Sequence, residues 1–296
     1  MNASEPLGTV RALWRYPVKS MLGEQVDAAD LSEGGIVGDR VYAVRDKETG
    51  KVASAKHPKL WPDLFGCRAC FVDQPRAGEG LPPVRIDLAD GSSVLSDADG
   101  VDTVLSRFFG REVELARSAQ NGYTIDQYHP DEPDYDPEGH RDEVVEAELG
   151  AAFFNARGLP SAVPEGSFFD LFPVSVLTTS TLDRLGELEP GIQWDERRFR
   201  MNVIVDTPAQ GYVENDWPGH TLAIGDEVKL GVALPDPRCV MPSLAQPDLP
   251  RDPGILKALV RHNRLDVAGM AYPCAGVYAV AEATGMMRTG DSVTLT

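Results

Sequence analysis

The sequence Leu-Pro-Asp-Pro-Arg-Cys-Val-Met-Pro, residues 234–242, combines three prolines with one cysteine. Pro235 and Pro237 fix their own φ near −65° and keep the residue before each out of the helical region. The segment therefore predicts a stiff, extended loop that presents Cys239. Arg238 beside it favours the thiolate, which is the form of cysteine that attacks electrophiles or binds metals. The alternative is that Cys239 is simply a small buried hydrophobic residue.

Composition narrows the classes of function. The chain has 296 residues and a net charge of −18, which disfavours binding to nucleic acid or to an anionic membrane. Its four cysteines are too few for a disulfide scaffold, and no secretory segment precedes them, so we expect a reducing, cytoplasmic location. The longest uncharged run, 267–281, is shorter than the roughly 20 residues of a membrane helix.

Hydrophobic patterning predicts a mainly β protein with some α (α+β). The chain is long enough to form two hydrophobic cores. We expect an N-terminal β-rich domain over 1–117, an acidic, proline-rich insertion over 118–165 and a second β-rich domain over 166–296. The predicted N-terminal elements are a strand at 9–14, a hairpin of 41–44 with 51–54, a hairpin of 84–88 with 94–95 and a helix at 98–109.

In the C-terminal third, a strand at 174–177 runs into hydroxyl residues and then a helix. Free backbone amides at such a helix start make a ready anion site, which brings Thr178 and Thr179 into consideration. A strand at 203–206 is entered through basic residues. A helix is expected at 255–262, with closing strands at 276–280 and 292–295.

The insertion holds 11 acidic residues against Arg141 and Arg157. Its stretch 131–140 is too acidic and too rich in proline to pack, so we expect a mobile loop, or one ordered by a cation or a partner. His129 and His140 lie near aspartates and could bind a metal, although their spacing is not diagnostic. The Cys67–Cys70 pair has no second pair to complete a zinc site and is interpreted as two packed thiols.

Several separated stretches together resemble one family, the MOSC proteins that carry an N-terminal β-barrel domain, a group that includes the amidoxime-reducing molybdenum enzymes. The stretches are Tyr16-Pro17-Val18-Lys19-Ser20, Gly38-Asp39-Arg40, Arg200-Met201-Asn202, Arg238-Cys239, Gly276-Val277-Tyr278 and Thr289-Gly290-Asp291. The resemblance covers nearly the whole chain outside the insertion. It implies an N-terminal β-barrel-like domain followed by a C-terminal MOSC β-barrel domain.

The resemblance also implies a molybdenum–pterin cofactor held between the two domains, with the Cys239 thiolate as metal ligand and catalytic residue. The positions that match cofactor contacts of the family are Lys19, Ser20, Arg40, Thr178, Thr179, Arg200, Asn202 and Arg238. Physical chemistry supports the cations independently, because a phosphate needs several fixed donors and arginine's planar fork is the best of them. Pro237 departs from the family, which often has a small polar residue at that place.

By similarity, we expect a molybdenum-cofactor oxidoreductase that reduces small N-hydroxylated or N-oxygenated compounds. The chain has no cysteine cluster for an iron–sulfur centre, so we expect electrons from a separate protein of ferredoxin, flavoprotein or cytochrome type. The acidic surface favours a donor with a positively charged docking patch.

Two alternatives use the same cysteine. The chain could be a non-catalytic carrier or binding protein for the molybdenum cofactor or for sulfur held on Cys239. It could instead be a cysteine-dependent hydrolase with His220 or His262 as base, although neither histidine has a sequence context that places it near the sulfur.

Overall fold

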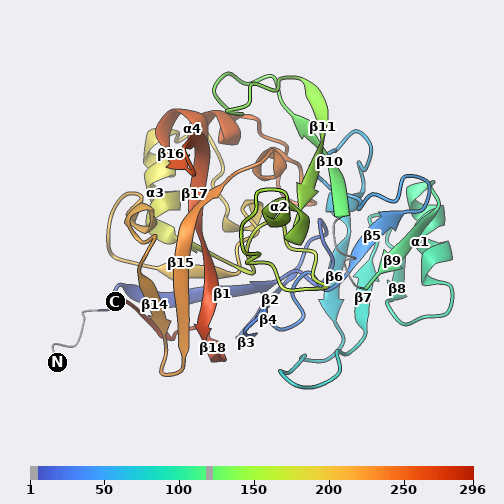
Figure 1. The fold of residues 1–296 in the computed structure, drawn as a ribbon, viewed down its shortest axis with the longest axis horizontal. Helices are drawn as coiled ribbons and strands as arrows, with labels where there is room; N and C mark the ends of the chain where they lie inside the picture. Colours follow the sequence, from blue (N-terminus) through green and yellow to red (C-terminus); the bar gives the residue numbers. More distant parts are fainter. Residues whose placement is uncertain (1–5, 118–122) are drawn as a thin grey trace.

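The computed structural model describes residues 6–117 and 123–296, so the predicted insertion is described from residue 123 onward. Strands dominate the molecule and the helices are short, which confirms the expected mainly β class (Figure 1). Among these residues, no helix is both long enough and apolar enough to cross a membrane.

Seven strands close into a barrel, because β12 and β17 pair with each other as well as with their other neighbours. In order around the barrel they are β12 (Val174–Thr178), β13 (Val203–Asp206), β1 (Gly8–Arg15), β19 (Ser292–Leu295), β14 (Thr221–Ile224), β15 (Val228–Pro237) and β17 (Met270–Ala283). Buried aliphatic side chains such as Val176, Leu222 and Val277 form its core. In β14 buried and partly exposed residues alternate, as expected for a strand with one face inward.

β1 lies between β13 and β19, so the N-terminal segment supplies one wall of a barrel otherwise built from residues 174–295. The two β-rich regions therefore share a sheet across the boundaries expected from the sequence. In Figure 1 the blue strand β1 crosses the orange and red strands of the barrel.

Helices and one further hairpin strand surround this barrel. α3 (Thr179–Leu188) joins β12 to the parallel strand β13, and α4 (Gly254–His262) precedes β16 (Arg264–Val267), which pairs with β17. The strand before Thr178, the helix at 255–262 and the two closing strands are confirmed. β15 extends through both prolines, because bulges at 232–234 and 235–237 accommodate them.

β2 (Glu24–Val26) pairs with β1 and so belongs to the large sheet. Other strands form small sheets. One contains β18 (Gly285–Arg288), β3 (Ala28–Ser32) and β4 (Gly35–Ile36), the next β5 (Ala43–Asp46) and β9 (Val113–Ala116), and another β6 (Arg68–Phe71), β7 (Val84–Asp87) and β8 (Ser93–Leu95). α1 (Val101–Phe109) ends at Gly110, and both it and the β7–β8 hairpin are confirmed. A second core around Trp61, Ile86 and Leu105 holds the region of β5 to β9 together, on the right of Figure 1.

The hairpin predicted for 41–44 with 51–54 is present as a short antiparallel bridge. Arg45 pairs with Val52, and the amides of Asp46 and Ala53 donate to the carbonyls of Lys51 and Val44. The Asp46 carboxylate holds the turn, because it accepts from the amides of Glu48 and Thr49 and binds Arg111. The sequence did not predict that β5 also pairs with β9, or that the Val52 amide donates to the carbonyl of Thr124.

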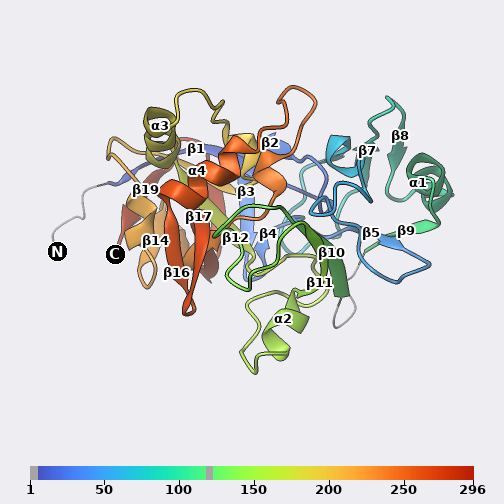
Figure 2. The same ribbon diagram turned by 90° about the horizontal axis from the view of Figure 1, so that it is seen from above.

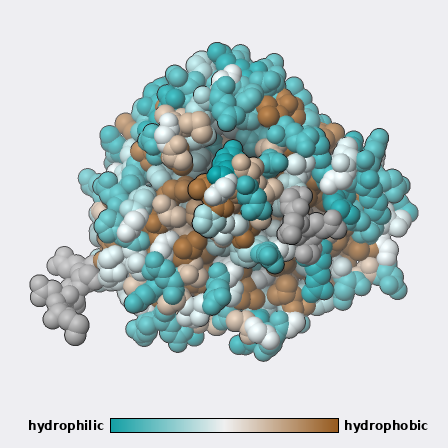
Figure 3. Space-filling view, viewed as in Figure 1, coloured by the Kyte–Doolittle hydropathy of each residue, from teal (hydrophilic) through white to brown (hydrophobic). Residues whose placement is uncertain are grey.

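The acidic stretch 131–140 lies in a loop, as expected, but the strands on either side of it were not predicted. β10 (Tyr123–His129) and β11 (Glu143–Leu149) form a seven-pair hairpin, followed by α2 (Ala151–Asn155). Tyr123 and Ile125 alternate toward a small core with Phe168, which leaves the acidic residues for the outer face. Figures 1 and 2 both show the hairpin between the barrel and the β5–β9 region. The top of Figure 3, over β10 and β11, is mostly hydrophilic.

Short 3-10 helices complete the chain: η1 (Leu64–Gly66), η2 (Glu196–Arg198), η3 (Val213–Asp216) and η4 (Met241–Ser243). η4 directly follows Cys239, and the fully buried guanidinium of Arg198 donates to the carbonyls of Pro242, Leu244 and Pro250. Arg198 therefore fixes the segment that begins at the cysteine.

Candidate functional site

Three of the motif stretches meet at Asp39. Its buried carboxylate accepts from the Tyr16 amide at 2.7 Å and from Nδ2 of Asn202 at 2.8 Å, and it pairs with Arg40. Gly38 has a positive φ, and a Cβ there would lie 2.5 Å from the Phe71 ring. Glycine is therefore required at the turn that places Asp39.

Arg40 and Arg200 stack on the ring of Tyr16, with the guanidinium carbons 4.4 and 4.3 Å from its centroid. Nη2 of Arg40 also donates to the carbonyl of Arg200 at 3.2 Å. Both residues and Ser20 have left-handed backbone (φ +48°, +57° and +64°) although none is glycine. Such conformations cost free energy and gather at functional sites.

A second pair of cations is centred on Asp170. Nζ of Lys19 and Nζ of Lys56 each bind one oxygen of its carboxylate, the second at 2.8 Å. Lys19 also donates to the carbonyl of Phe168. Burial lowers the pKa of Lys19 to about 8, in spite of the Asp170 charge. Although burial alone would raise it, the two ammonium groups hold the pKa of Asp170 well below its usual range.

The end of β15 supplies the last cation. Nη1 of Arg238 binds Asp236, and Nη2 donates to the carbonyl of Phe199 at 2.6 Å. Burial raises the pKa of Asp236 to about 6. Because Phe199 precedes Arg200 in the chain, this contact joins the Arg238–Cys239 stretch to the Arg40–Arg200 pair.

Cys239 is half-buried, with one side against Leu22, Phe65 and Met241. Its charged form faces cations, since a Cys239 thiolate contributes to raising the pKa of Lys56 and of Arg238, against the effect of burial. Tyr135, from the loop of the β10–β11 hairpin, also lies within reach of this charge and is only 4% exposed. The sulfur therefore lies against an apolar wall, and its charge is coupled to those of Lys56 and Arg238.

These groups suit an anionic guest. Five cations (Lys19, Lys56, Arg40, Arg200 and Arg238) face three carboxylates (Asp39, Asp170 and Asp236), an excess of two positive charges in a chain of net charge −18. A phosphate group carries about 1.5 to 2 negative charges. Nε of Arg238 is buried without a hydrogen-bond partner, so this guanidinium has a donor left for an anion.

The structure places the other predicted residues differently. Thr178 caps α3 and donates to Glu214 at 2.7 Å, while Thr179 donates to Asp206. Thr178 pairs with Val205, so both threonines lie at the end of β13 away from Asn202. The helix start does attract an acidic group, but Glu214 of the chain itself supplies it.

Asn202 lies at the site but is occupied. Its Oδ1 accepts from the amide and hydroxyl of Ser175, while Nδ2 donates to Asp39 and to the carbonyl of Trp14. Its role is to connect strands beneath Arg40 and Arg200. The expected free amide contact to a guest is therefore not available.

Sequence reasoning missed Lys56, Asp170 and Tyr135. Lys56 follows the short apolar run 52–55, and Asp170 follows two phenylalanines. Both local sequences look like those of ordinary loops. Only the tertiary contacts reveal that Lys56 pairs with Asp170. Tyr135 lies in the acidic stretch that was expected to be solvated.

Two other features are separate from this group. His262, one of the candidate bases for a hydrolase, binds Glu189 at 2.9 Å on the surface of α4. A surface hollow of about 420 Å³ lies beside α1 and is lined by other residues, among them Lys47, Arg107 and Arg111. Cys67 and Cys70 are both free thiols, as expected.

Two family models match the sequence of the chain. The family model of the MOSC N-terminal beta barrel domain matches residues 7–64, and that of the MOSC domain matches residues 165–294. No curated protein matches the sequence. Among solved structures, the YUAD protein from Bacillus subtilis is similar over 97% of this chain and 94% of its own, with 13% identity and a TM-score of 0.42. The two matched domains lie in the order expected from the motif stretches, and the chain therefore belongs to the MOSC-domain proteins that carry a MOSC N-terminal β-barrel domain.

Proposed function

We propose that the chain is a molybdenum-cofactor oxidoreductase that reduces small N-hydroxylated or N-oxygenated compounds with electrons from a separate protein. MOSC domains are associated with molybdenum-cofactor binding. The single observation that supports the proposal is the convergence of five cations from distant parts of the chain around one half-buried cysteine.

The chain's own residues have separate roles in this proposal. Arg40, Arg200 and Lys19 hold the phosphate of the pterin, and their strained or tightly packed backbones keep the donors in place before the anion arrives. Cys239 provides the thiolate ligand, and Arg238 follows the end of β15 directly before it. When bound, the cofactor supplies two-electron chemistry with transfer of an oxygen atom. Thr178 and Thr179 are not part of the proposed site.

Tyr135 limits access to the sulfur from the side of the hairpin. Because its ring is buried beside Cys239, a substrate has to be small or the hairpin loop has to move aside. The hydroxyl can also donate a hydrogen bond to an oxygen atom held near the sulfur, since burial keeps its pKa well above the usual range and the proton in place.

The electron donor is proposed from charge alone. The chain's net charge of −18 repels acidic partners and favours a donor with a basic docking surface. A ferredoxin, flavoprotein or cytochrome-type protein with such a surface fits this requirement.

The test is metal content and turnover in the same preparations. Wild-type protein and Cys239→Ala, both made in a host that synthesises the cofactor, are assayed for molybdenum and for reduction of an amidoxime by a reduced viologen dye. We expect molybdenum and turnover in the wild type, and loss of turnover in Cys239→Ala with the fold intact. Folded wild-type protein without molybdenum contradicts the proposal.

The same experiment separates the alternatives. Molybdenum without reduction of any N-oxygenated compound, even with a protein donor, supports a carrier of the cofactor. Hydrolytic activity that depends on Cys239 and is indifferent to molybdenum supports a hydrolase.

A further inference from the structure

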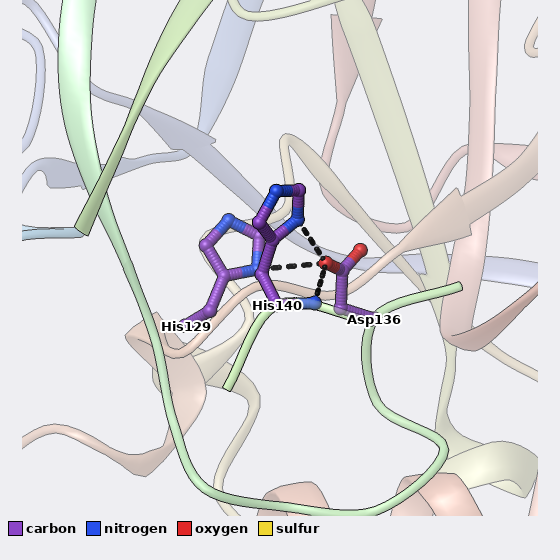
Figure 4. A group of neighbouring side chains, drawn as sticks. All are labelled: His129, Asp136 and His140. Carbon is purple, nitrogen blue, oxygen red and sulfur yellow. Dashed lines mark hydrogen bonds and ion pairs between the residues drawn. The ribbon is translucent and has the colours of Figure 1, made fainter. Parts of the chain in front are cut away.

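The loop of the β10–β11 hairpin brings together two histidines and an aspartate. His129 ends β10, whereas Asp136 and His140 lie in the loop before β11. Nδ1 of His140 is 2.7 Å from Oδ2 of Asp136, and Nδ1 of His129 is 3.4 Å from the same oxygen. Figure 4 shows both rings turned toward this carboxylate.

One member of the trio lacks a partner. Oδ2 of Asp136 already accepts from the amide and from the ring of His140, whereas Nδ1 of His129 makes no hydrogen bond although it is buried. His129 as a whole is only 9% exposed. A buried, unpaired ring nitrogen that points at a carboxylate is costly unless another group joins them.

We propose that His129, Asp136 and His140 bind a divalent transition-metal ion of the zinc class. The three ligand atoms lie within 4.8 Å of one another. In a tetrahedral zinc site with bonds of about 2.0–2.1 Å, ligand atoms are roughly 3.3 Å apart, so small side-chain rotations complete the geometry. Two imidazoles and one carboxylate favour such a metal over Mg²⁺ or Ca²⁺, which prefer oxygen ligands.

The surroundings favour a cation at this point. Glu143 pairs directly with His129 across the hairpin, and Oε2 of Glu138 is 3.9 Å from the His140 ring. Glu138, 58% exposed at its side chain, or a water can provide a fourth ligand.

Metal binding here would fix the loop that covers Cys239. Tyr135 immediately precedes Asp136, and its ring lies 6.0 Å from that of His129. The loop is otherwise attached to the barrel by exposed ion pairs, Glu132 with Lys257 and Asp134 with Arg264, which each contribute little. The metal would therefore hold Tyr135 in place more firmly than these contacts can.

The experiment is a titration of the full chain, freed of metal by a chelator, with Zn²⁺ and with Co²⁺. We expect one equivalent bound at a nitrogen and oxygen site, without the charge-transfer absorption of a cobalt thiolate. His140→Ala, whose side chain is partly exposed, and His129→Ala should each bind at least about 100-fold more weakly, since even loss of an outer partner costs 10–100-fold. His220→Ala, an exposed histidine elsewhere, and Cys239→Ser should bind as the wild type does.

A second readout follows the loop itself. Trypsin cleavage after Arg141, which is half exposed in the loop, should slow severalfold on adding Zn²⁺, while cleavage after the exposed Arg76 is unchanged. The slowing should disappear in His140→Ala. The proposal is overturned if Zn²⁺ binds no better to the wild type than to the two histidine variants, or if Cys239→Ser removes the binding.

Discussion

Replacing Arg200 by methionine should weaken anion binding without weakening the fold. The Arg200 guanidinium is buried between Tyr16 and Phe65, and among the described residues its only side-chain hydrogen bond runs from Nη1 to the carbonyl of Met21, at 2.5 Å. Its other N–H groups are therefore free for an oxyanion. Methionine has a similar length and can keep the packing on Tyr16 while removing the charge.

The two expected effects have opposite signs. Burial, together with the charge of Arg40, lowers the pKa of Arg200 to about 10 from 12.5, so the charged form costs about 3 kcal/mol in the free protein. The variant is relieved of this cost, but it loses the hydrogen bond to Met21 and the stacking on the aromatic rings. Its free energy of unfolding should therefore equal that of the wild type or exceed it by up to about 2 kcal/mol. A charge-assisted hydrogen bond to phosphate contributes about 2 kcal/mol, so affinity should fall about 30-fold.

Two assays measure these effects. Unfolding of molybdenum-free protein in guanidinium reports its stability. Anion binding is reported by the molybdenum content after expression in a cofactor-competent host, and by the concentration of inorganic phosphate that protects the protein against thermal unfolding. Arg184→Met, at an exposed arginine of α3 paired with Glu187, is the matched control. Equal molybdenum content and equal phosphate protection in Arg200→Met and in the control would show that Arg200 does not bind the anion. A marked loss of stability in Arg200→Met would show that its buried charge does not cost free energy.

Three further predictions use the same structure. Phosphate protection should decline as pH rises through about 8, where Lys19 loses its proton and its attraction for the anion, and Lys19→Arg should move this decline to higher pH. Arg198→Met removes the donor from the carbonyls of Pro242, Leu244 and Pro250, of which the first two belong to buried residues, and should lower the free energy of unfolding by about 3 kcal/mol. The partly exposed ion pair of Arg197 with Asp195, lost in Arg197→Met, should cost less than about 1 kcal/mol in the same denaturant titration. Tyr135→Ala should speed alkylation of Cys239 by iodoacetamide severalfold, and Tyr135→Phe should leave the rate near that of the wild type. An unchanged rate in Tyr135→Ala would mean that the tyrosine does not cover the sulfur.

The strands and helices with simple periodicity could be predicted from the sequence. The strand that ends at Thr178, the helix that ends at Gly110 and the closing strands were recognisable because apolar residues recur with the period of the element and capping residues follow. The pairing of β5 with β9 could not be predicted, since the turn at Asp46 satisfies the same local rules whichever strand becomes the partner. Register depends on contacts that are distant in sequence.

The site shows the same division. Lys19, Arg40, Arg200 and Arg238 were named from the motif stretches. The structure links Arg40 to Arg200 through Tyr16, Lys19 to Lys56 through Asp170, and Arg238 to the carbonyl of Phe199. The hydroxyls after β12 were a reasonable expectation from helix-start chemistry, but a buried glutamate from η3 already occupies that position. The hairpin of β10 with β11 was not predicted, because the overall charge of the insertion concealed the alternation of Tyr123 and Ile125.

The position of β19 between β1 and β14 has a consequence for how the protein is made. Residues 292–295 follow every other strand of the ring in the sequence, and until they pair, β1 and β14 both keep an open edge. The ring of strands therefore stays open until residues 292–295 have been made, and a chain from which these residues are deleted should remain an open sheet prone to self-association.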